Sequence, residues 1–209
     1  MDSSGISYFN ARQHLYKIDI VTIFYNNERE LLSLSLQAAS FKYLDTLLIN
    51  NIYLLYNDNK PLDYNTIIEY YPTYLQSRVS IIDRTSLSNK NNENSWVSQQ
   101  IFKLLISEYI TTKYYLVLDT KNHFIKPTTY NTFFKNNKPI LYCHIDKNNE
   151  NITTKFSELG GKGHPGIRYS KYLENIYYFN KSPPIYFNHN ITPYIFITSK
   201  VIELIKECE

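Results

Sequence analysis

The stretch Tyr114-Tyr115-Leu116-Val117-Leu118-Asp119 decides the fold that this chain is expected to adopt. It is a run of Tyr, Leu and Val that ends on a carboxylate, and the polar residues Thr120-Lys121-Asn122-His123 follow. A strand that is apolar on both faces is typical of a parallel sheet covered by helices. Ligands of such sheets bind just beyond the carboxyl ends of the strands, so Asp119 stands where a ligand would be held. An Asp at a strand end is as often a helix cap or a turn former, and that reading stays open.

The rest of the chain alternates between strand and helix patterns. Further strands are predicted at 18–25, 52–56, 79–83 and 141–145, and helices from Asn27 to about Ala39, from Ser95 to Tyr109 and from Ser199 to Glu207. This order predicts an α/β fold with a mostly parallel central sheet flanked by helices. Since 209 residues fit one such domain, residues 1–209 are expected to form a single domain.

Composition and charge narrow the function classes. A net charge of +3 with 20% charged residues, and no block of Lys and Arg, argues against general nucleic-acid binding. The N-terminus is polar, and no apolar run approaches the roughly 18 residues that span a bilayer. We therefore expect no membrane span and a soluble, cytoplasmic protein. The two cysteines, Cys143 and Cys208, are expected to be free thiols.

The predicted helix from Ser95 to Tyr109 carries two different faces. Its buried stripe is expected to consist of Val97, Ile101, Leu104 and Leu105, which follow helical spacing. A second face groups a ring, an amide and a cation, because Trp96, Gln100 and Lys103 stand at i, i+4 and i+7. These three residue types suit a ligand that carries a ring and a phosphate.

This helix and the strand after it carry a family resemblance. The pattern Trp-x-x-Gln-Gln-x-x-Lys-Leu, which begins at Trp96, precedes the strand that ends at Asp119 and the run Phe124-Ile125-Lys126-Pro127. Together they resemble a little-characterised family of GT-A-type glycosyltransferases. The similarity continues at 191–196 and the helix that follows, and so covers most of the chain from Ile18. It implies a Rossmann-like GT-A domain that binds a nucleotide-diphosphate sugar as donor and a sugar or glycan as acceptor.

One departure from the resembled pattern concerns the metal. Enzymes of this kind usually carry Asp-x-Asp at the strand end, where the two carboxylates hold Mn²⁺ or Mg²⁺ against the nucleotide diphosphate. This chain has Asp119-Thr120-Lys121 instead. A lysine repels a metal ion, yet it can neutralise phosphate itself as a point charge. A metal at Asp119 and a metal-independent site are therefore both open.

Two other predicted strand ends supply donor-site candidates. Tyr25 and Asn26 follow the first strand, where an aromatic ring and an amide would meet a nucleotide base. Asp83 and Arg84 end the third strand, where Arg84 would pair with phosphate or with neighbours of Asp83. For Asn27, the next residue in the first of these loops, a helix cap is favoured.

The second half of the chain supplies three more candidates. Glu158 is a candidate catalytic base on the acceptor side. The other catalytic candidate is Asp119. His164 stands in a His-Pro-Gly step that matches a motif for metal and phosphate binding in some retaining GT-A enzymes, within a glycine cluster typical of a lid or a surface loop. His189 precedes Thr192-Pro193, where the resemblance places a late strand beside the donor site, although a lone histidine is more often structural.

Two function classes follow. In the first, a glycosyltransferase of the hexosyltransferase type binds the diphosphate of a UDP-, GDP- or dTDP-sugar with Lys103, Lys121 and Arg84 for glycan or polysaccharide synthesis. Asp119 orients the donor sugar or a cation, and an acceptor hydroxyl attacks the anomeric carbon. In the second, a nucleotide-sugar-binding or scaffold domain has lost the metal motif. In the resembled family the chain continues beyond the helix that here spans Ser199 to Glu207. We therefore expect this chain to be the N-terminal part of a longer protein or to use a partner for acceptor recognition.

Overall fold

The computed structural model describes residues 17–87, 96–140 and 193–208. Within these ranges the chain is an α/β domain with a mostly parallel sheet flanked by helices, as its sequence predicts. The expected strand at 141–145, the glycine cluster and the candidates Glu158, His164 and His189 lie outside the described residues. No helix in the described ranges is long and apolar enough to cross a bilayer.

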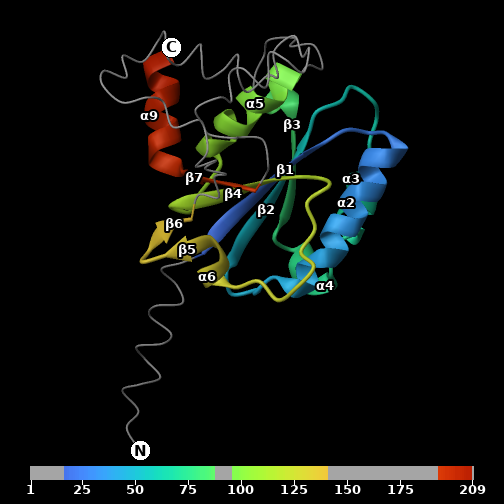
Figure 1. Cartoon of the computed structure of the whole chain (residues 1–209). Coiled ribbons are helices and arrows are strands. Elements are labelled where there is room, and N and C mark those ends of the chain that lie inside the picture. Colours follow the sequence, from blue (N-terminus) through green and yellow to red (C-terminus); the bar gives the residue numbers. More distant parts are fainter. Residues whose placement is uncertain (1–16, 88–95, 141–192, 209) are drawn as a thin grey trace, which may run out of the picture. The chain divides into compact units, whose positions relative to one another are not determined.

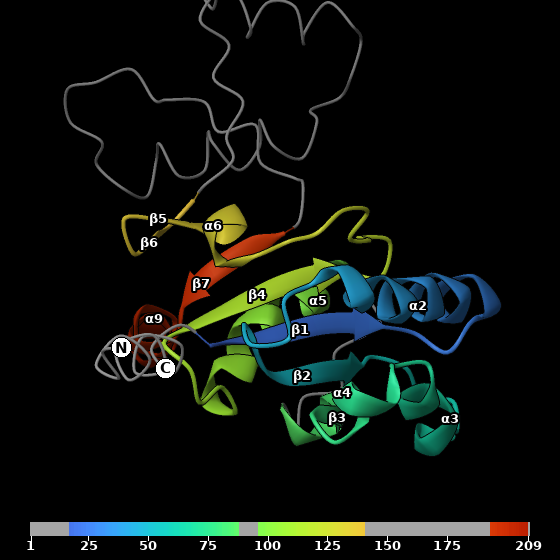
Figure 2. The same cartoon turned by 90° about the horizontal axis from the view of Figure 1, so that it is seen from below.

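The described strands form one sheet of five with the order β3-β2-β1-β4-β7, and a separate two-stranded pair. β1 (Ile18–Phe24), β2 (Ile49–Tyr56), β3 (Val79–Asp83) and β4 (Tyr114–Asp119) are parallel, and β7 (Tyr194–Ile197) runs antiparallel to β4 (Figure 2). The register pairs Ile23 with Asp119, and Tyr56 with both Phe24 and Asp83. The four parallel strands therefore end at one edge of the sheet, which we call the carboxyl edge.

Helices cover both faces of this sheet (Figure 1). One face packs against α2 (Glu28–Ser40), α3 (Tyr64–Glu69), α4 (Thr73–Gln76) and α6 (Tyr130–Phe133). The other packs against α5 (Trp96–Leu105), the 3-10 helix η4 (Ile106–Glu108) and α9 (Thr198–Cys208). Successive strand residues alternate between the faces, so Ile20 lies in the core under α2 and Val21 in the core under α5. The remaining short elements are η2 (Phe41–Tyr43), η3 (Arg84–Ser86), β5 (Phe134–Lys135) and β6 (Lys138–Pro139).

The start of α2 confirms the cap that its sequence predicts. Asn27 has an extended backbone, and its side-chain oxygen accepts a hydrogen bond from the backbone N–H of Glu30 at 3.0 Å. This bond satisfies one of the amide groups that have no partner inside the helix. Two acidic residues, Glu28 and Glu30, lie in the first turn, where the helix dipole favours negative charge.

The buried stripe predicted for α5 is wrong at Ile101. Ile101 is 40% exposed, whereas Phe102 and Ile106 are buried against the sheet. The helix is turned by about one residue, or 100°, from the expected orientation. An aromatic ring buries more apolar area than an isoleucine side chain, so the orientation that places Phe102 inside is favoured. The α-helix also ends at Leu105, four residues before the predicted end, and continues as η4.

Candidate functional site

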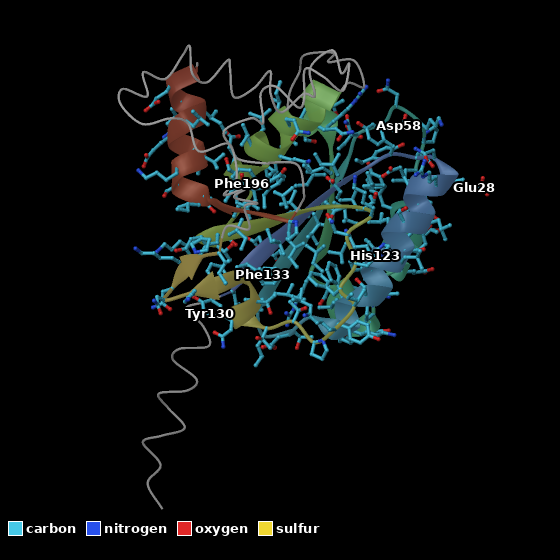
Figure 3. The ribbon with its side chains drawn as sticks, viewed as in Figure 1. Glu28, Asp58, His123, Tyr130, Phe133 and Phe196 are labelled. Carbon is cyan, nitrogen blue, oxygen red and sulfur yellow. The ribbon has the colours of Figure 1, made fainter. Side chains whose placement is uncertain are left out.

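Polar side chains gather at the carboxyl edge, on the face of the sheet that α5 covers. Asp119 alternates in phase with Tyr115 and Val117, which both lie in the core under α5. Asn57 directly follows β2 and is fully buried, and Tyr25 directly follows β1 and is half-buried. In Figure 3, Glu28 and Asp58 mark the side of the molecule at which β1 and β2 end, and Tyr130 and Phe133 lie toward the opposite side.

Asp119 contacts two lysines, one buried and one exposed. The Lys103 Nζ donates to Asp119 Oδ1 at 3.3 Å, and the Lys121 Nζ lies 3.8 Å from Asp119 Oδ2. The exposed fractions of these side chains are 7% for Lys103, 78% for Lys121 and 32% for Asp119. The structure therefore brings together three of the sequence-predicted site residues, and each carboxylate oxygen faces a different ammonium group.

A buried amide on α2 fixes the backbone that carries Asp119. The Gln37 Nε2 donates to the carbonyl oxygens of Asp119 at 2.7 Å and Asn122 at 3.1 Å, while its Oε1 accepts from the Thr22 hydroxyl at 3.0 Å. Asn122 Oδ1 in turn accepts from the backbone N–H of Asp119 at 2.7 Å. Beside it, the Thr120 hydroxyl donates to Glu30 at 2.8 Å. The strand end is thus tied to α2, and the one signal for Gln37 in the sequence is an amide within an apolar helix face.

A second polar group links β1, β2 and α5. The Tyr25 hydroxyl accepts from Asn57 Nδ2 at 2.8 Å and from Gln99 Nε2 at 2.6 Å. The Oδ1 of Asn57 is buried and has no hydrogen-bond partner in the described part of the chain. Gln99 and Asn57 were not predicted, whereas Tyr25 was. The signal for Gln99 is its place in the Gln-Gln pair, from which the sequence favours Gln100 by its spacing to Lys103.

Asn26, Asp83 and Arg84, the other candidates at the ends of β1 and β3, make contacts within and between the neighbouring loops. Asn26 donates from Nδ2 to the carbonyl oxygen of Pro61 at 2.8 Å, and its own carbonyl accepts from Lys60 Nζ at 3.1 Å. Asp83 caps η3 by accepting from the Thr85 N–H at 2.9 Å, and Arg84 donates to Asn59. Three strand spacings, about 14 Å in all, separate β3 from β4, so the end of β3 does not join the group around Asp119.

Gln100 and Trp96 are the other two predicted site residues on α5. Gln100 is half-buried, and within the described ranges no hydrogen bond links its side chain to Asp119 or Tyr25. The side chain of Trp96 lies outside the described residues. The expected face of ring, amide and cation stays a prediction, and in the described part of α5 it is Gln99 and Lys103 that bond at separate points of the carboxyl edge.

Tyr194 on β7 adds an aromatic hydroxyl to this neighbourhood. Burial of the phenol and, second, the negative charge of Asp119 raise the pKa of Tyr194 above its ordinary value. Tyr194 pairs with Val117, the residue that precedes Asp119 by two positions on the same face of β4. The hydroxyl of Tyr194 stays protonated at neutral pH and is a neutral donor next to the Asp119 site.

The described residues do not fit a divalent cation at Asp119. Mn²⁺ and Mg²⁺ are bound by several oxygen ligands, of which carboxylates carry the charge. Asp119 instead contacts two ammonium groups, and in residues 17–87, 96–140 and 193–208 no group of three or more His, Cys, Asp or Glu side chains is arranged to hold a metal. The chemistry of this donor set favours an anionic ligand over a cation.

Fold and site together define an α/β domain whose polar, mixed-charge site lies at the carboxyl edge of a mostly parallel sheet. The model of DUF6492, a family of unknown function, matches residues 26–204, and the chain belongs to this family. A search of curated proteins finds no match to the sequence.

Proposed function

We propose that this chain is a GT-A-type glycosyltransferase domain that binds a nucleotide-diphosphate sugar and transfers the sugar to a hydroxyl acceptor. The observation that carries the proposal is the position of Asp119, at the end of β4 and between the ammonium groups of Lys103 and Lys121. The strand β7, which lies antiparallel beside β4, also supports it, because the sequence resemblance implies a late strand beside the donor site.

Each described group has a role in this proposal. Lys121, which is exposed, attracts the diphosphate, and Asp119 orients the donor sugar. The half-buried Tyr25, held by Asn57 and Gln99 at the end of the neighbouring strand, meets the nucleotide base. The acceptor oxygen forms a bond to the anomeric carbon while the bond to the diphosphate breaks, and the diphosphate leaves with the bonding electrons. The acceptor proton passes to a base, for which Glu158 stays the sequence candidate.

The alternative is a domain that binds a nucleotide sugar without transferring it. Lys121 favours this alternative, since it stands where the resembled enzymes have a second metal-binding carboxylate. Both functions predict donor binding, and they differ in whether the nucleotide diphosphate is released.

A thermal-shift screen of UDP-, GDP- and dTDP-sugars at millimolar concentration, with and without EDTA, tests donor binding. A ligand at ten times its Kd stabilises the folded state by about 1.4 kcal/mol. For a domain of this size that raises the Tm by about 3–6 °C. We expect at least one sugar nucleotide to do so in the wild-type chain.

The matched variants are Lys121→Met and Lys126→Met. Both remove an exposed lysine from the loop after β4, but Lys126 has no ion pair with Asp119. Lys121→Met should reduce the shift and Lys126→Met should leave it unchanged. Absence of a shift with every nucleotide sugar would contradict donor binding. Release of nucleotide diphosphate from a bound donor separates the enzyme from the non-catalytic alternative.

A further inference from the structure

Lys103 is held in place by both its side chain and its backbone. Its side chain is 7% exposed, and its Nζ donates to Asp119 Oδ1 at 3.3 Å. The backbone of the same residue is also tied to β4, because the Lys103 carbonyl accepts from the buried Tyr115 hydroxyl at 3.0 Å. A buried ammonium requires a partner of opposite charge, and Asp119 supplies it. Lys103 therefore cannot move into solvent to make room for another cation without losing this partner.

The second lysine behaves differently. Lys121 is 78% exposed and lies 3.8 Å from Asp119 Oδ2, so its side chain can exchange this contact for a contact with a ligand. The three groups together carry one net positive charge. The buried lysine neutralises the carboxylate, and the exposed lysine leaves the charge of the site positive toward solvent.

A divalent cation bound to Asp119 would lie close to the Lys103 ammonium. Mg²⁺ binds carboxylate oxygens at about 2.0–2.1 Å, and a metal at Asp119 would carry its charge to within a few Å of the Lys103 ammonium. The two positive charges would repel each other at low effective dielectric, because Lys103 is buried. Asp119 is the carboxylate in both ion pairs of this group, and within residues 17–87, 96–140 and 193–208 no group of three or more His, Cys, Asp or Glu side chains is arranged to offset the repulsion.

We propose that the Lys103 ammonium is the built-in counter-ion of Asp119, takes the place of a divalent cation, and makes the site one that binds an anion without a metal. The proposal concerns the site of the proposed function and rests on that function only for the identity of the anion as a diphosphate. Whether a metal is excluded from Asp119 can be tested without any sugar nucleotide.

The test uses Mn²⁺ alone on the full chain, so that its result is independent of donor binding. In wild-type protein, we expect electron paramagnetic resonance to detect no saturable Mn²⁺ binding at millimolar metal. We also expect no selective paramagnetic broadening of the backbone amide signals of 118–122. Lys103→Met removes the ammonium but keeps an unbranched side chain, and it should create a saturable Mn²⁺ site with a Kd about tenfold or more below the highest metal concentration at which the wild type shows no binding. Adding Asp119→Asn to Lys103→Met should abolish the new site.

Lys126→Met is the matched control, because it removes a lysine that does not contact Asp119, and it should bind Mn²⁺ as the wild type does. Circular dichroism checks the fold of each variant, and Lys103→Gln replaces Lys103→Met if the latter does not fold. Saturable Mn²⁺ binding by the wild type that Asp119→Asn abolishes would overturn the proposal, whatever the variants do. A negative donor screen with a negative wild-type Mn²⁺ titration would instead contradict the proposed function and leave the metal-free site standing.

Discussion

Tyr71 shows how one buried residue affects stability without any role at the site. Its ring packs against Phe41 with 5.6 Å between ring centroids, but its buried hydroxyl has no hydrogen-bond partner in the described part of the chain. A buried polar group without a partner reduces stability, because it has lost its hydrogen bonds to water. We expect Tyr71→Phe to leave the free energy of unfolding at pH 7 unchanged or to raise it by about 1 kcal/mol, as measured by urea denaturation.

The same residue predicts a pH dependence. Burial raises the pKa of Tyr71 above its ordinary value of 10.0. For an acid whose pKa is raised in the folded state, the stabilisation is complete below the unfolded pKa and is lost as the pH rises through the folded pKa. Tyr71→Phe should therefore move the midpoint of alkaline unfolding to higher pH, whereas the exposed Tyr74→Phe should not. A loss of stability at pH 7 would show that the hydroxyl has a hydrogen-bond partner, and an unchanged alkaline midpoint would show that burial does not raise its pKa.

At the scale of elements, the hairpin of β5 and β6 depends on an unusual backbone. Asn136 and Asn137 connect the two strands with φ values of 52° and 61°, the left-handed region that a two-residue type I′ loop requires. Asparagine tolerates this region better than residues other than glycine. Asn136→Ala should destabilise the hairpin by about 1 kcal/mol, and Asn136→Gly should not.

Hydrogen exchange measures this effect locally. The amide of Ile140 donates to the Phe133 carbonyl at 2.7 Å next to the hairpin, so its exchange should accelerate in Asn136→Ala and stay slow in Asn136→Gly. Equal exchange rates in both variants would mean that the loop conformation does not limit the stability of the hairpin.

Which elements the sequence could predict follows from how local their signals are. β1, β3, β4 and α2 carry apolar runs or a cap within a few residues, and all were predicted to within two residues. β2 begins three residues before the predicted start, because the polar residues Asn50 and Asn51 interrupt the apolar pattern of the strand. The polarity of Asn50 is explained by a distant partner, Asp19, which accepts from Asn50 Nδ2, and the Asn51 Nδ2 donates to the Tyr53 hydroxyl.

The candidate site follows the same rule. Position at a strand end is a local property, so Asp119 and Tyr25 were found from the sequence. Gln37 and Gln99 act through contacts across 82 and 74 residues of the chain, and no local pattern distinguishes them from other amides. The rotation of α5 was missed for a related reason, because only packing against β1 and β4 decides between Ile101 and Phe102.

At the scale of the whole molecule, the carboxyl edge of the sheet and the opposite edge, at which the parallel strands begin, have different roles. Opposite the carboxyl edge, the fully buried Asp19 accepts hydrogen bonds from β2 and from the loop before β4, at 2.9 Å from the Asn51 N–H, 3.0 Å from the Thr111 N–H and 2.9 Å from the Thr112 hydroxyl. Four residues along β1, about 13 Å, separate this group from the position level with Asp119. One edge holds the strands together, and the other is the edge at which we propose that the ligand binds.

Replacing Asp19 therefore tests the separation of the two edges. Asp19→Asn replaces an acceptor oxygen with a donor that faces other donors, and it should lower the free energy of unfolding by about 2–4 kcal/mol in urea denaturation. Below the melting transition, the Kd for a sugar nucleotide that binds the wild type should stay the same. Glu207→Gln, an exposed change on α9, is the control and should alter neither quantity. A weakened Kd in folded Asp19→Asn protein would show that the two edges are coupled.

The late position of β7 in the sequence has a consequence during synthesis on the ribosome. β4 ends at Asp119, but its antiparallel neighbour begins only at Tyr194. At translation rates of about 5–20 residues per second, roughly 4 to 15 s pass between the two. During that interval the nascent chain holds an apolar strand with one side unpaired, which is a surface that other nascent chains can join. Pairing of β4 with β7 therefore cannot begin until residues 194–197 have left the ribosome, and the risk of association with other nascent chains is greatest before then.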